Sequence, residues 1–396
     1  MLSLDKVFNA QTVLKNIVRE TKLVRAYGIA PECELYLKPE NLQITGSFKV
    51  RGSAYKIAML TDEEKKKGVI ACSAGNHAQG VALAATKNGI RSLICLPDSA
   101  PISKVEATKG YGAEVCLVEG CYDDAYAKAL ELRDSEGYTF VHPFDDENVI
   151  AGQGTIALEI LNDLDNIDAI VVPIGGGGLI SGIAYTAKQI RPSIKIYGVQ
   201  AAGAPSMYNS VKDGEIERLS SVSTIADGIA VKQPGENTYA LVKEYVDEIA
   251  LVTDDEVSSA ILALIEKQKM IAEGAGAVAV AAVMFGKFNL KNKRVVAVVS
   301  GGNIDVTSLS RVIDRGLLKS GRSSSLLIEL IDKPGQLKEI SRIIADCGGN
   351  VTGVHYEKGA TESVNGCFLR IEMETRDFEH VNLITKTLRD EGFKLV

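Results

Sequence analysis

The sequence contains no tryptophan, few prolines (10 of 396 residues) and no long apolar run. The apolar segment at residues 275–285 is too short to cross a bilayer, which needs about 20 residues. The net charge is −7, because 44 lysines and arginines are outnumbered by 51 acidic residues, and no basic block is present. Binding to nucleic acid or to an anionic membrane is therefore not expected.

The cysteines exclude further classes of protein. They are seven in number, form no Cys-x-x-Cys pair, and stand at positions 33, 72, 95, 116, 121, 347 and 367. This scatter argues against a disulfide scaffold or a zinc site and favours a reducing compartment. Residues 1–18 have the pattern of an amphipathic helix and lack the apolar core of a secretion signal. We expect a cytoplasmic protein without a bound metal.

What is present is typical of a folded protein of two or three domains. The sequence has 46% hydrophobic and 24% charged residues. From residue 68 to residue 303, short runs rich in valine and isoleucine alternate with longer amphipathic segments, such as 169–174 followed by 179–190. This alternation predicts βαβ units and parallel sheets covered by helices on both faces, which is the α/β class.

The pattern changes at residues 318–324, a short polar stretch rich in serine that is typical of a linker. The order βαββαβ follows, with strands expected at 325–330, 350–356, 367–375 and 393–396 and helices at 334–349 and 376–392. This is the order of ferredoxin-like domains. We predict a separate small domain over residues 325–396.

The first candidate site is Lys49, within Thr-Gly-Ser-Phe-Lys-Val-Arg-Gly at residues 45–52. A lysine between Phe48 and Val50 is dehydrated, which lowers its pKa and frees the amine to form a Schiff base. The Ser-Phe-Lys tripeptide alone is more often an ordinary surface segment. The interpretation therefore depends on the other motifs.

The second candidate is the loop Ser73, Ala74, Gly75 and Asn76, which follows a predicted strand and begins a helix. Free N–H groups at a helix start attract an anion such as a substrate carboxylate. The Asn76 amide could also donate a hydrogen bond to a cofactor hydroxyl. A simple capped helix start explains the residues almost as well. For His77 we predict a structural role, because no other metal ligand has suitable spacing.

The third candidate is the run Gly175, Gly176, Gly177, Gly178 and Leu179, between a predicted strand and a predicted helix. Four glycines lose much conformational entropy on folding, but they let the backbone curl around a phosphate with its N–H groups inward. The run is neither Gly-x-Gly-x-x-Gly nor a P-loop, so a terminal monophosphate fits best. A plain loop is the alternative.

The fourth motif, Ser300-Gly301-Gly302-Asn303, also ends a predicted strand. Ligands of open α/β sheets bind beyond the carboxyl ends of strands, so the motifs that follow strands are expected to converge on one crevice. In this order and spacing, the four motifs resemble those of the fold-type II pyridoxal-phosphate enzymes, and among them the serine/threonine dehydratases, or threonine ammonia-lyases. The spacing from Glu40 to Lys49 is similar to that family's attachment-site signature.

The resemblance covers about residues 5–317, including segments 151–155 and 226–235. It implies a two-lobed fold like that of the tryptophan synthase β subunit. The catalytic domain would span residues 1–317, with a smaller lobe at about 50–148.

The resemblance also implies roles for individual residues. Lys49 would hold pyridoxal 5'-phosphate (PLP) covalently, with Phe48 against the ring, Asn76 on the 3-hydroxyl, residues 175–179 on the phosphate and Ser300 on the ring nitrogen. Lys49 would then remove the α-proton of L-threonine, and loss of the β-hydroxyl would give 2-oxobutanoate and ammonia. L-Serine, which gives pyruvate, is expected as a secondary substrate.

Related enzymes provide the alternatives. Serine racemases have a second serine where this chain has Ala74, which argues against racemisation. Their divalent metal is held by carboxylates where this chain has Gln200 and Ser206, so we expect no such ion. A β-replacement enzyme or a threonine synthase shares the scaffold. A non-catalytic amino-acid sensor is the alternative from another class.

The C-terminal segment resembles an ACT domain, a small amino-acid-sensing module. The resemblance implies an effector site at residues Asp332, Pro334, Gly335, Gln336 and Leu337, and pairing between chains in a homodimer or homotetramer. A dimerisation module without a ligand is the alternative. Isoleucine biosynthesis and threonine catabolism both remain open as the pathway.

Overall fold

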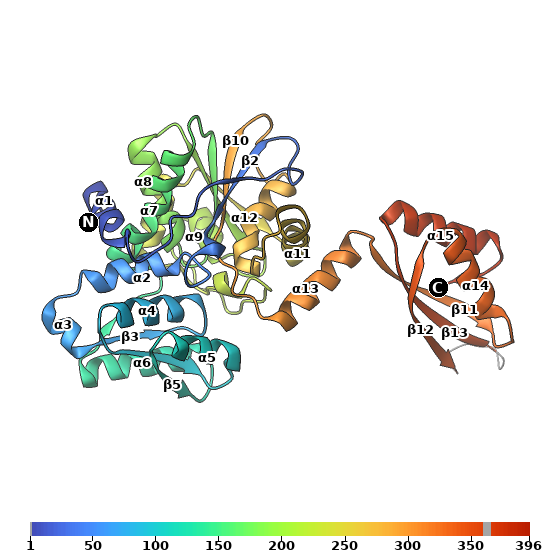
Figure 1. Ribbon diagram of the computed structural model, residues 1–396, viewed down its shortest axis with the longest axis horizontal. Helices are drawn as coiled ribbons and strands as arrows, with labels where there is room; N and C mark the ends of the chain where they lie inside the picture. Colours follow the sequence, from blue (N-terminus) through green and yellow to red (C-terminus); the bar gives the residue numbers. More distant parts are fainter. Residues whose placement is uncertain (1, 359–365) are drawn as a thin grey trace. The chain divides into compact units, whose positions relative to one another are not determined.

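The computed structural model describes residues 2–358 and 366–396. The chain divides into two compact units, Met1–Val306 and Thr307–Val396. The first unit consists of two lobes, each built on its own sheet (Figure 1). Among the described residues, no helix is both long enough and apolar enough to cross a membrane.

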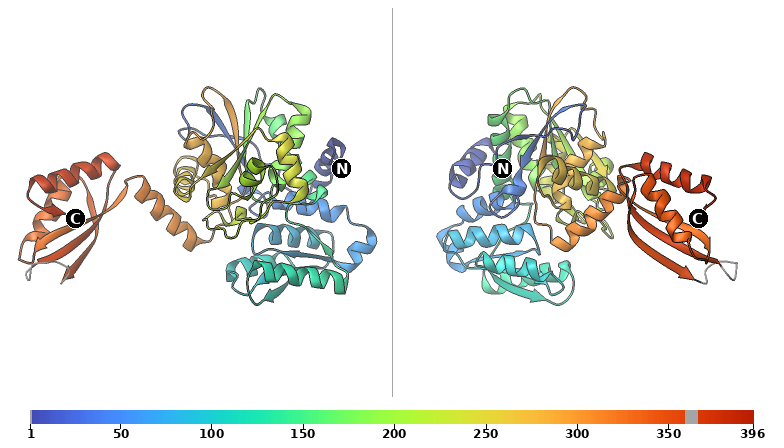
Figure 2. Two further views of the ribbon diagram at one scale, coloured as in Figure 1. Left: turned by 180° about the vertical axis from the view of Figure 1, so that it is seen from behind. Right: turned by 45° about the vertical axis from the view of Figure 1, so that its right-hand side comes forward.

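The larger lobe is built on a six-stranded sheet in the order β1-β2-β10-β7-β8-β9. Every neighbouring pair except β1 with β2 is parallel, as the alternating pattern predicts. Helices cover both faces: α12 contacts β7 to β10 on one side, while α7, α8 and α10 form a core with the other (Figure 2). The strands are β1 (Val24–Arg25), β2 (Glu34–Pro39), β7 (Ala169–Pro173), β8 (Lys195–Ala201), β9 (Glu248–Val252) and β10 (Arg294–Val299). The helices are α1 (Leu4–Leu14), α7 (Glu147–Asp163), α8 (Gly178–Ile190), α9 (Ser206–Asp213), α10 (Glu236–Tyr245), α11 (Asp254–Ala263) and α12 (Gly274–Met284).

The smaller lobe has a four-stranded parallel sheet in the order β5-β4-β3-β6. Its two faces pack against α4 and α6 respectively, and α2 contacts both α4 and α7, so α2 joins the lobes. The strands are β3 (Val69–Cys72), β4 (Ser92–Pro97), β5 (Glu114–Val118) and β6 (Thr139–Phe140). The helices are α2 (Lys49–Ala58), α3 (Asp62–Lys67), α4 (Asn76–Lys87), α5 (Ile102–Gly110) and α6 (Tyr122–Glu136).

Three short helical segments complete the first unit. Two are 3₁₀ turns, η1 (Glu40–Leu42) and η2 (Asp227–Ile229), and the third is a π-helical turn, η3 (Leu264–Gln268), at the end of α11.

The second unit contains a four-stranded antiparallel sheet in the order β12-β13-β11-β14, with a core formed by α14 and α15. Its chain order is βαββαβ, so the predicted ferredoxin-like arrangement is confirmed. Residues 359–365 of the predicted domain lie outside the described residues. The elements are α13 (Val306–Lys319), β11 (Ser323–Ile331), α14 (Gln336–Asp346), β12 (Asn350–Lys358), β13 (Gly366–Glu374), α15 (Phe378–Asp390) and β14 (Lys394–Leu395).

The connection between α13 and β11 is shorter than the predicted linker at residues 318–324. Its first two residues end α13 and its last two begin β11, which leaves only residues 320–322 between the elements. Ser323 pairs with Glu374 of β13 through the backbone. Backbone pairing does not require an apolar side chain, so a serine-rich segment can begin a strand.

Candidate active site

Lys49 is the first residue of α2 and lies against the end of β10. Ser47 forms a β-bridge with Gly301, and the Phe48 N–H donates to the Ser300 carbonyl at 3.1 Å. These bonds bring the Lys49 and Ser300 motifs together from distant parts of the sequence. The Ser300 hydroxyl is 3% exposed and donates to the Ala275 carbonyl at 3.3 Å.

The Lys49 amine lies in an apolar environment. Its Nζ is 5.3 Å from the centre of the Phe48 ring and donates to the Pro143 carbonyl at 2.8 Å. Burial lowers the pKa of Lys49 to about 8, although the Glu273 carboxylate opposes this shift. About a tenth of the amine is therefore uncharged at pH 7, and the uncharged form is the one that a nucleophile or a proton acceptor requires.

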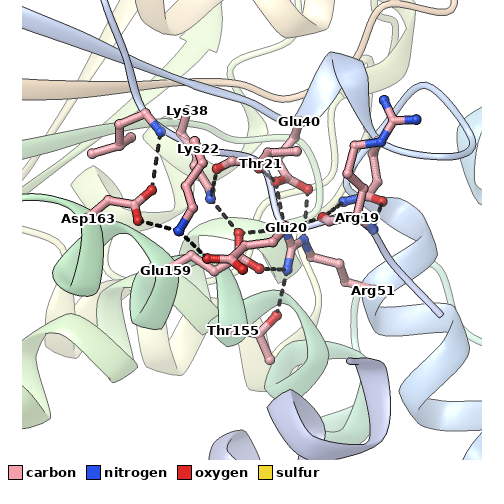
Figure 3. Close-up of polar contacts among 12 residues, drawn as sticks. Arg19, Glu20, Thr21, Lys22, Lys38, Glu40, Arg51, Thr155, Glu159 and Asp163 are labelled. Atoms are coloured by element: carbon pink, nitrogen blue, oxygen red, sulfur yellow. Dashed lines mark hydrogen bonds and ion pairs between the residues drawn. The ribbon is translucent and has the colours of Figure 1, made fainter. Parts of the chain in front are cut away.

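A buried ion network fixes the first turn of α2 (Figure 3). Arg51 is 1% exposed and binds the Glu40 carboxylate at 2.8 Å and the Glu159 carboxylate at 2.6 Å. Lys38 pairs with the second oxygen of Glu159, and Thr155 accepts from Arg51. Burial alone would raise the pKa of Glu40, but the charge and hydrogen bonds of Arg51, together with Lys38 and Thr21, outweigh it and lower that pKa. The network ties α2 to β2, η1 and α7 beside Lys49.

The predicted anion loop connects β3 to α4. Ser73 accepts a hydrogen bond from the Gly75 N–H at 3.2 Å, and Ala74 packs on the core of the smaller lobe. The first bond within α4 runs from Gln79 to Gly75. The N–H groups of the first three helical residues, Asn76 among them, thus have no partner within the helix, as an anion site requires.

The side chain of Asn76 points toward the larger lobe. Its Nδ2 donates to Glu273 Oε1 at 2.6 Å, and its Oδ1 accepts from Asn303 Nδ2 at 2.7 Å. These contacts connect the anion loop to the Ser300 motif, which Asn303 ends.

The glycine run is a tight turn between β7 and α8. Gly177 has φ +100°, and a Cβ on Gly176 would lie 2.4 Å from the Phe144 ring. Thr238 donates to the Gly176 carbonyl at 2.6 Å and fixes the turn from α10. The first bond within α8 runs from Ser181 to Gly177, so the N–H groups at the start of the helix are free for a phosphate.

The flanking members of the run are also closely packed. A Cβ on Gly175 would lie 3.1 Å from the Ile229 Cα, and one on Gly178 would lie 2.9 Å from the Phe144 backbone. Leu179, by contrast, is 5% exposed and its side chain belongs to the core of the larger lobe. Only its backbone is available to a ligand.

Three functional positions were not recognised in the sequence. Pro143 and Phe144 contact Lys49 and the glycine run, in a turn where His142 Nδ1 accepts from the Asp145 N–H at 2.7 Å. The sequence signal was His-Pro-Phe itself, to which we assigned no role. Glu273 gave no signal, because its neighbours in the site come from remote parts of the chain.

His77, Gln200 and Ser206 make ordinary structural contacts. His77 is 3% exposed and its Nε2 donates to the Val141 carbonyl at 2.8 Å, and burial lowers the pKa of His77 to about 3. Gln200 and Ser206 are fully buried, and Gln200 accepts from the Tyr208 N–H. Among the described residues, no cluster of three His, Cys, Asp or Glu side chains is arranged to hold a metal.

The predicted effector residues lie in the second unit, between β11 and α14. Asp332, Pro334 and Gly335 are exposed, and Gly335 adopts φ +97° immediately before the helix. Gln336 and Leu337 form the first turn of α14 and are partly exposed.

Comparison with known proteins identifies the chemistry. Residues 14–301 match the family described as pyridoxal-phosphate-dependent enzymes. The chain belongs to this family. It is 48% identical to an L-threonine ammonia-lyase of Thermotoga maritima, across 100% of this chain and 99% of that protein. A catabolic L-threonine dehydratase of Staphylococcus aureus is also 48% identical, across 80% of this chain and 93% of the relative.

Solved structures of the family have the same fold as the first unit. The processed form of threonine deaminase isoform 2 from Solanum lycopersicum aligns with a TM-score of 0.74 and 39% identity, over 79% of this chain and 94% of that one. Maize serine racemase aligns with a TM-score of 0.75 and 35% identity, over 80% and 98% of the two chains. The predicted fold-type II architecture is confirmed.

The site residues are compatible with PLP, the family's cofactor. An amine with a lowered pKa is present at Lys49, and free N–H groups suitable for a phosphate begin α8. The second N–H of the Asn76 amide and the Ser300 hydroxyl can bind the polar atoms of a ring. Phe144 packs closely against Gly176 and Gly178 and leaves no room for side chains there, so this part of the site is formed by backbone atoms.

Proposed function

We propose that this chain is a threonine ammonia-lyase that converts L-threonine to 2-oxobutanoate and ammonia. The main support is the buried, partly uncharged Lys49 amine, together with the free helix starts of α4 and α8 in the predicted motifs. The similarity to L-threonine ammonia-lyases over the whole chain supports the same activity.

The proposed residue roles are those that the resemblance implies, and the contacts of these residues are compatible with them. Lys49 binds the cofactor, with Phe48 beside the ring, and afterwards accepts the α-proton of the substrate. Residues 73–76 bind the substrate carboxylate, and residues 175–179 bind the cofactor phosphate through backbone N–H groups. The side chains of Asn76 and Ser300 orient the ring. When bound, PLP withdraws electrons from the α-carbon and so acidifies its proton.

L-Serine is the expected secondary substrate, with pyruvate as the product. It differs from threonine by one methyl group, and one methyl in a pocket changes discrimination by only about 1–3 kcal/mol.

The assignment can be tested on the attachment residue and the products. Borohydride reduction of the loaded enzyme, followed by digestion and mass spectrometry, should place a pyridoxyl group on Lys49. Lys49→Ala should lose both the adduct and 2-oxo acid release from L-threonine, while Lys56→Ala, on the same helix, should retain both. A pyridoxyl group on another lysine, or on none, contradicts the proposal.

Racemisation is the second candidate, because serine racemases are among the structures of the same fold. Ala74 replaces the serine expected of that activity, which favours elimination. Incubation with L-serine should give pyruvate with little D-serine. A β-replacement activity would show as a new amino acid when a thiol is supplied, and a non-catalytic sensor would not take up the cofactor.

We further propose that residues 325–396 form an ACT regulatory domain. Its ferredoxin-like fold and the exposed loop before α14 support an amino-acid effector at Asp332, Pro334, Gly335, Gln336 and Leu337. The long antiparallel strands suit pairing in a homodimer or homotetramer. A cytoplasmic location and a role in isoleucine biosynthesis or threonine catabolism belong to the same proposal.

A further inference from the structure

Glu273 is an ionisable residue in the site that the proposed mechanism leaves without a role. It precedes α12 and is 5% exposed, but its side chain makes no capping bond to its own helix. Instead, Glu273 Oε1 accepts from Asn76 Nδ2 of the smaller lobe at 2.6 Å. A Cβ on Gly301 would lie 2.4 Å from the same oxygen, so the carboxylate lies directly beside the Ser300 motif.

A chain of hydrogen bonds fixes the orientation of the Asn76 amide. Asn303 Nδ2 donates to the Thr45 carbonyl at 2.7 Å and to Asn76 Oδ1 at 2.7 Å. Because a carbonyl can only accept, the nitrogen of Asn303 faces Asn76, whose own nitrogen then faces Glu273. One N–H of Asn76 is used by Glu273, and the other remains for the ring oxygen of the cofactor.

Charged groups from three other elements act on Glu273. Burial, and after it the Asp227 charge of η2, raise the pKa of Glu273, while Asn76, Lys104 of α5 and Lys49 of α2 lower it; the net result is a pKa of about 7. Lys104 and Asp227 also form an ion pair at 2.8 Å. The charge of this buried carboxyl therefore changes within the neutral range.

We propose that Glu273 is a positioning residue that, through Asn76, couples its own ionisation to the protonation of the cofactor's ring oxygen. This inference depends on the proposed function, in which Asn76 binds that oxygen. Ionised Glu273 accepts a stronger, charge-assisted bond from Asn76 and places a negative charge near the ring oxygen, which disfavours a second negative charge there. Protonated Glu273 removes that charge, and its proton comes from solvent.

The experiment is a pH titration of the absorption spectrum of the loaded, full-length enzyme without substrate. The ratio of the two absorption bands that report the ring-oxygen proton should change with a midpoint near neutral pH. Glu273→Gln keeps an oxygen that can accept from Asn76 but cannot ionise. This variant should bind the cofactor at Lys49 and lose the spectral transition.

Two charge variants serve as matched controls. Asp227→Asn removes a charge that raises the pKa of Glu273, so the midpoint should move down, and Lys104→Met removes one that lowers it, so the midpoint should move up. Each shift should be a few tenths of a pH unit, because both groups are partly exposed. If Glu273 had only a structural role, the two charge variants would not move the midpoint of the spectral transition in opposite directions.

The inference is overturned if Glu273→Gln keeps the wild-type midpoint, or if both charge variants leave it unchanged. If Glu273→Gln does not bind the cofactor, the charge variants alone decide. A wild-type enzyme with no adduct on Lys49 contradicts the proposed function instead, so the two failures are distinguishable.

Discussion

Burial determines the protonation state of individual side chains in the site. His77 illustrates this, because it is in the same motif as Asn76 but faces the core of the smaller lobe, where its Nε2–H binds the Val141 carbonyl. Its environment accommodates only the neutral ring, and burial and the Lys49 charge both lower the pKa of His77 to about 3. A histidine beside reactive groups is in this case a structural residue.

His77 should make stability depend on pH. In the unfolded chain its pKa is about 6.5, so below that pH the unfolded state binds a proton that the folded state does not, and stability decreases as the pH is lowered. At pH 5 the loss relative to pH 8 should be about 2 kcal/mol. Urea unfolding of His77→Gln should show a flatter dependence than wild type. The exposed His355→Gln variant should retain the wild-type slope, and equal slopes for wild type and His77→Gln would contradict this explanation.

Gly176 should be intolerant of even one added carbon. A methyl group there would overlap the Phe144 ring at 2.4 Å, and relieving that overlap should cost about 1–3 kcal/mol of stability. We expect Gly176→Ala to unfold at a lower temperature and to bind PLP more weakly, measured by thermal unfolding with and without cofactor. Gly110→Ala, where the added carbon meets nothing within 4 Å, should show neither effect.

At the scale of elements, α2 decides where the reactive amine lies. Its first residue is Lys49, and two residues later Arg51 joins η1 and α7 through Glu40 and Glu159 (Figure 3). The helix also packs on α4 of the smaller lobe. Lys49 is thus held by both lobes.

Removing Arg51 should lower the free energy of unfolding far more than removing an exposed member of an ion pair. Arg51→Ala leaves Glu40 buried and without its main counter-charge, which costs about 3–5 kcal/mol. We also expect a lower yield of the borohydride-reduced Lys49 adduct. Arg91→Ala, which breaks an exposed pair with Glu114, should behave almost as wild type in urea unfolding and in the yield of the adduct. Similar losses in both variants would show that the buried network has no special role.

At the scale of the whole molecule, the two units differ in the kind of sheet they contain and in the loops that the sheets support. The parallel sheets of the first unit end in loops that form the site, whereas the antiparallel sheet of the second supports the exposed turn before α14. In the regulation that we propose, an effector bound at that turn would act on elimination by favouring one of two states of the enzyme.

Branched-chain amino acids should therefore change the threonine dependence of 2-oxo acid release. In Gln336→Ala, that response should weaken while release without effector stays at the wild-type rate, because Gln336 lies outside the catalytic unit. Sedimentation with and without the amino acid should report two or four chains of 42.3 kDa. A response that is identical in Gln336→Ala would place the effector elsewhere.

The sequence by itself determined the class of fold, the cofactor chemistry and the four motifs. Local patterns suffice for the fold class and the motifs, because glycine runs, strand periods and helix starts depend on neighbouring residues. The cofactor was implied by the resemblance of the four motifs to a known family. The ferredoxin-like order of the second unit was also predictable, although the serine-rich start of β11 was not.

Only the tertiary structure decided which side chains surround the motifs. Nothing in the local sequence of Glu273 indicates that it contacts Asn76. Asn303 belongs to a motif and Phe144 to the His-Pro-Phe segment, but their partners in the site, Asn76 and the glycine run, are remote along the chain. The lowered pKa of Lys49 was predicted from its apolar neighbours, but the raised pKa of Glu273 was not, since it depends on burial and on charges that are remote along the chain. Electrostatic interactions act through space, so an amine and a carboxyl acquire their pKa values only when the lobes come together.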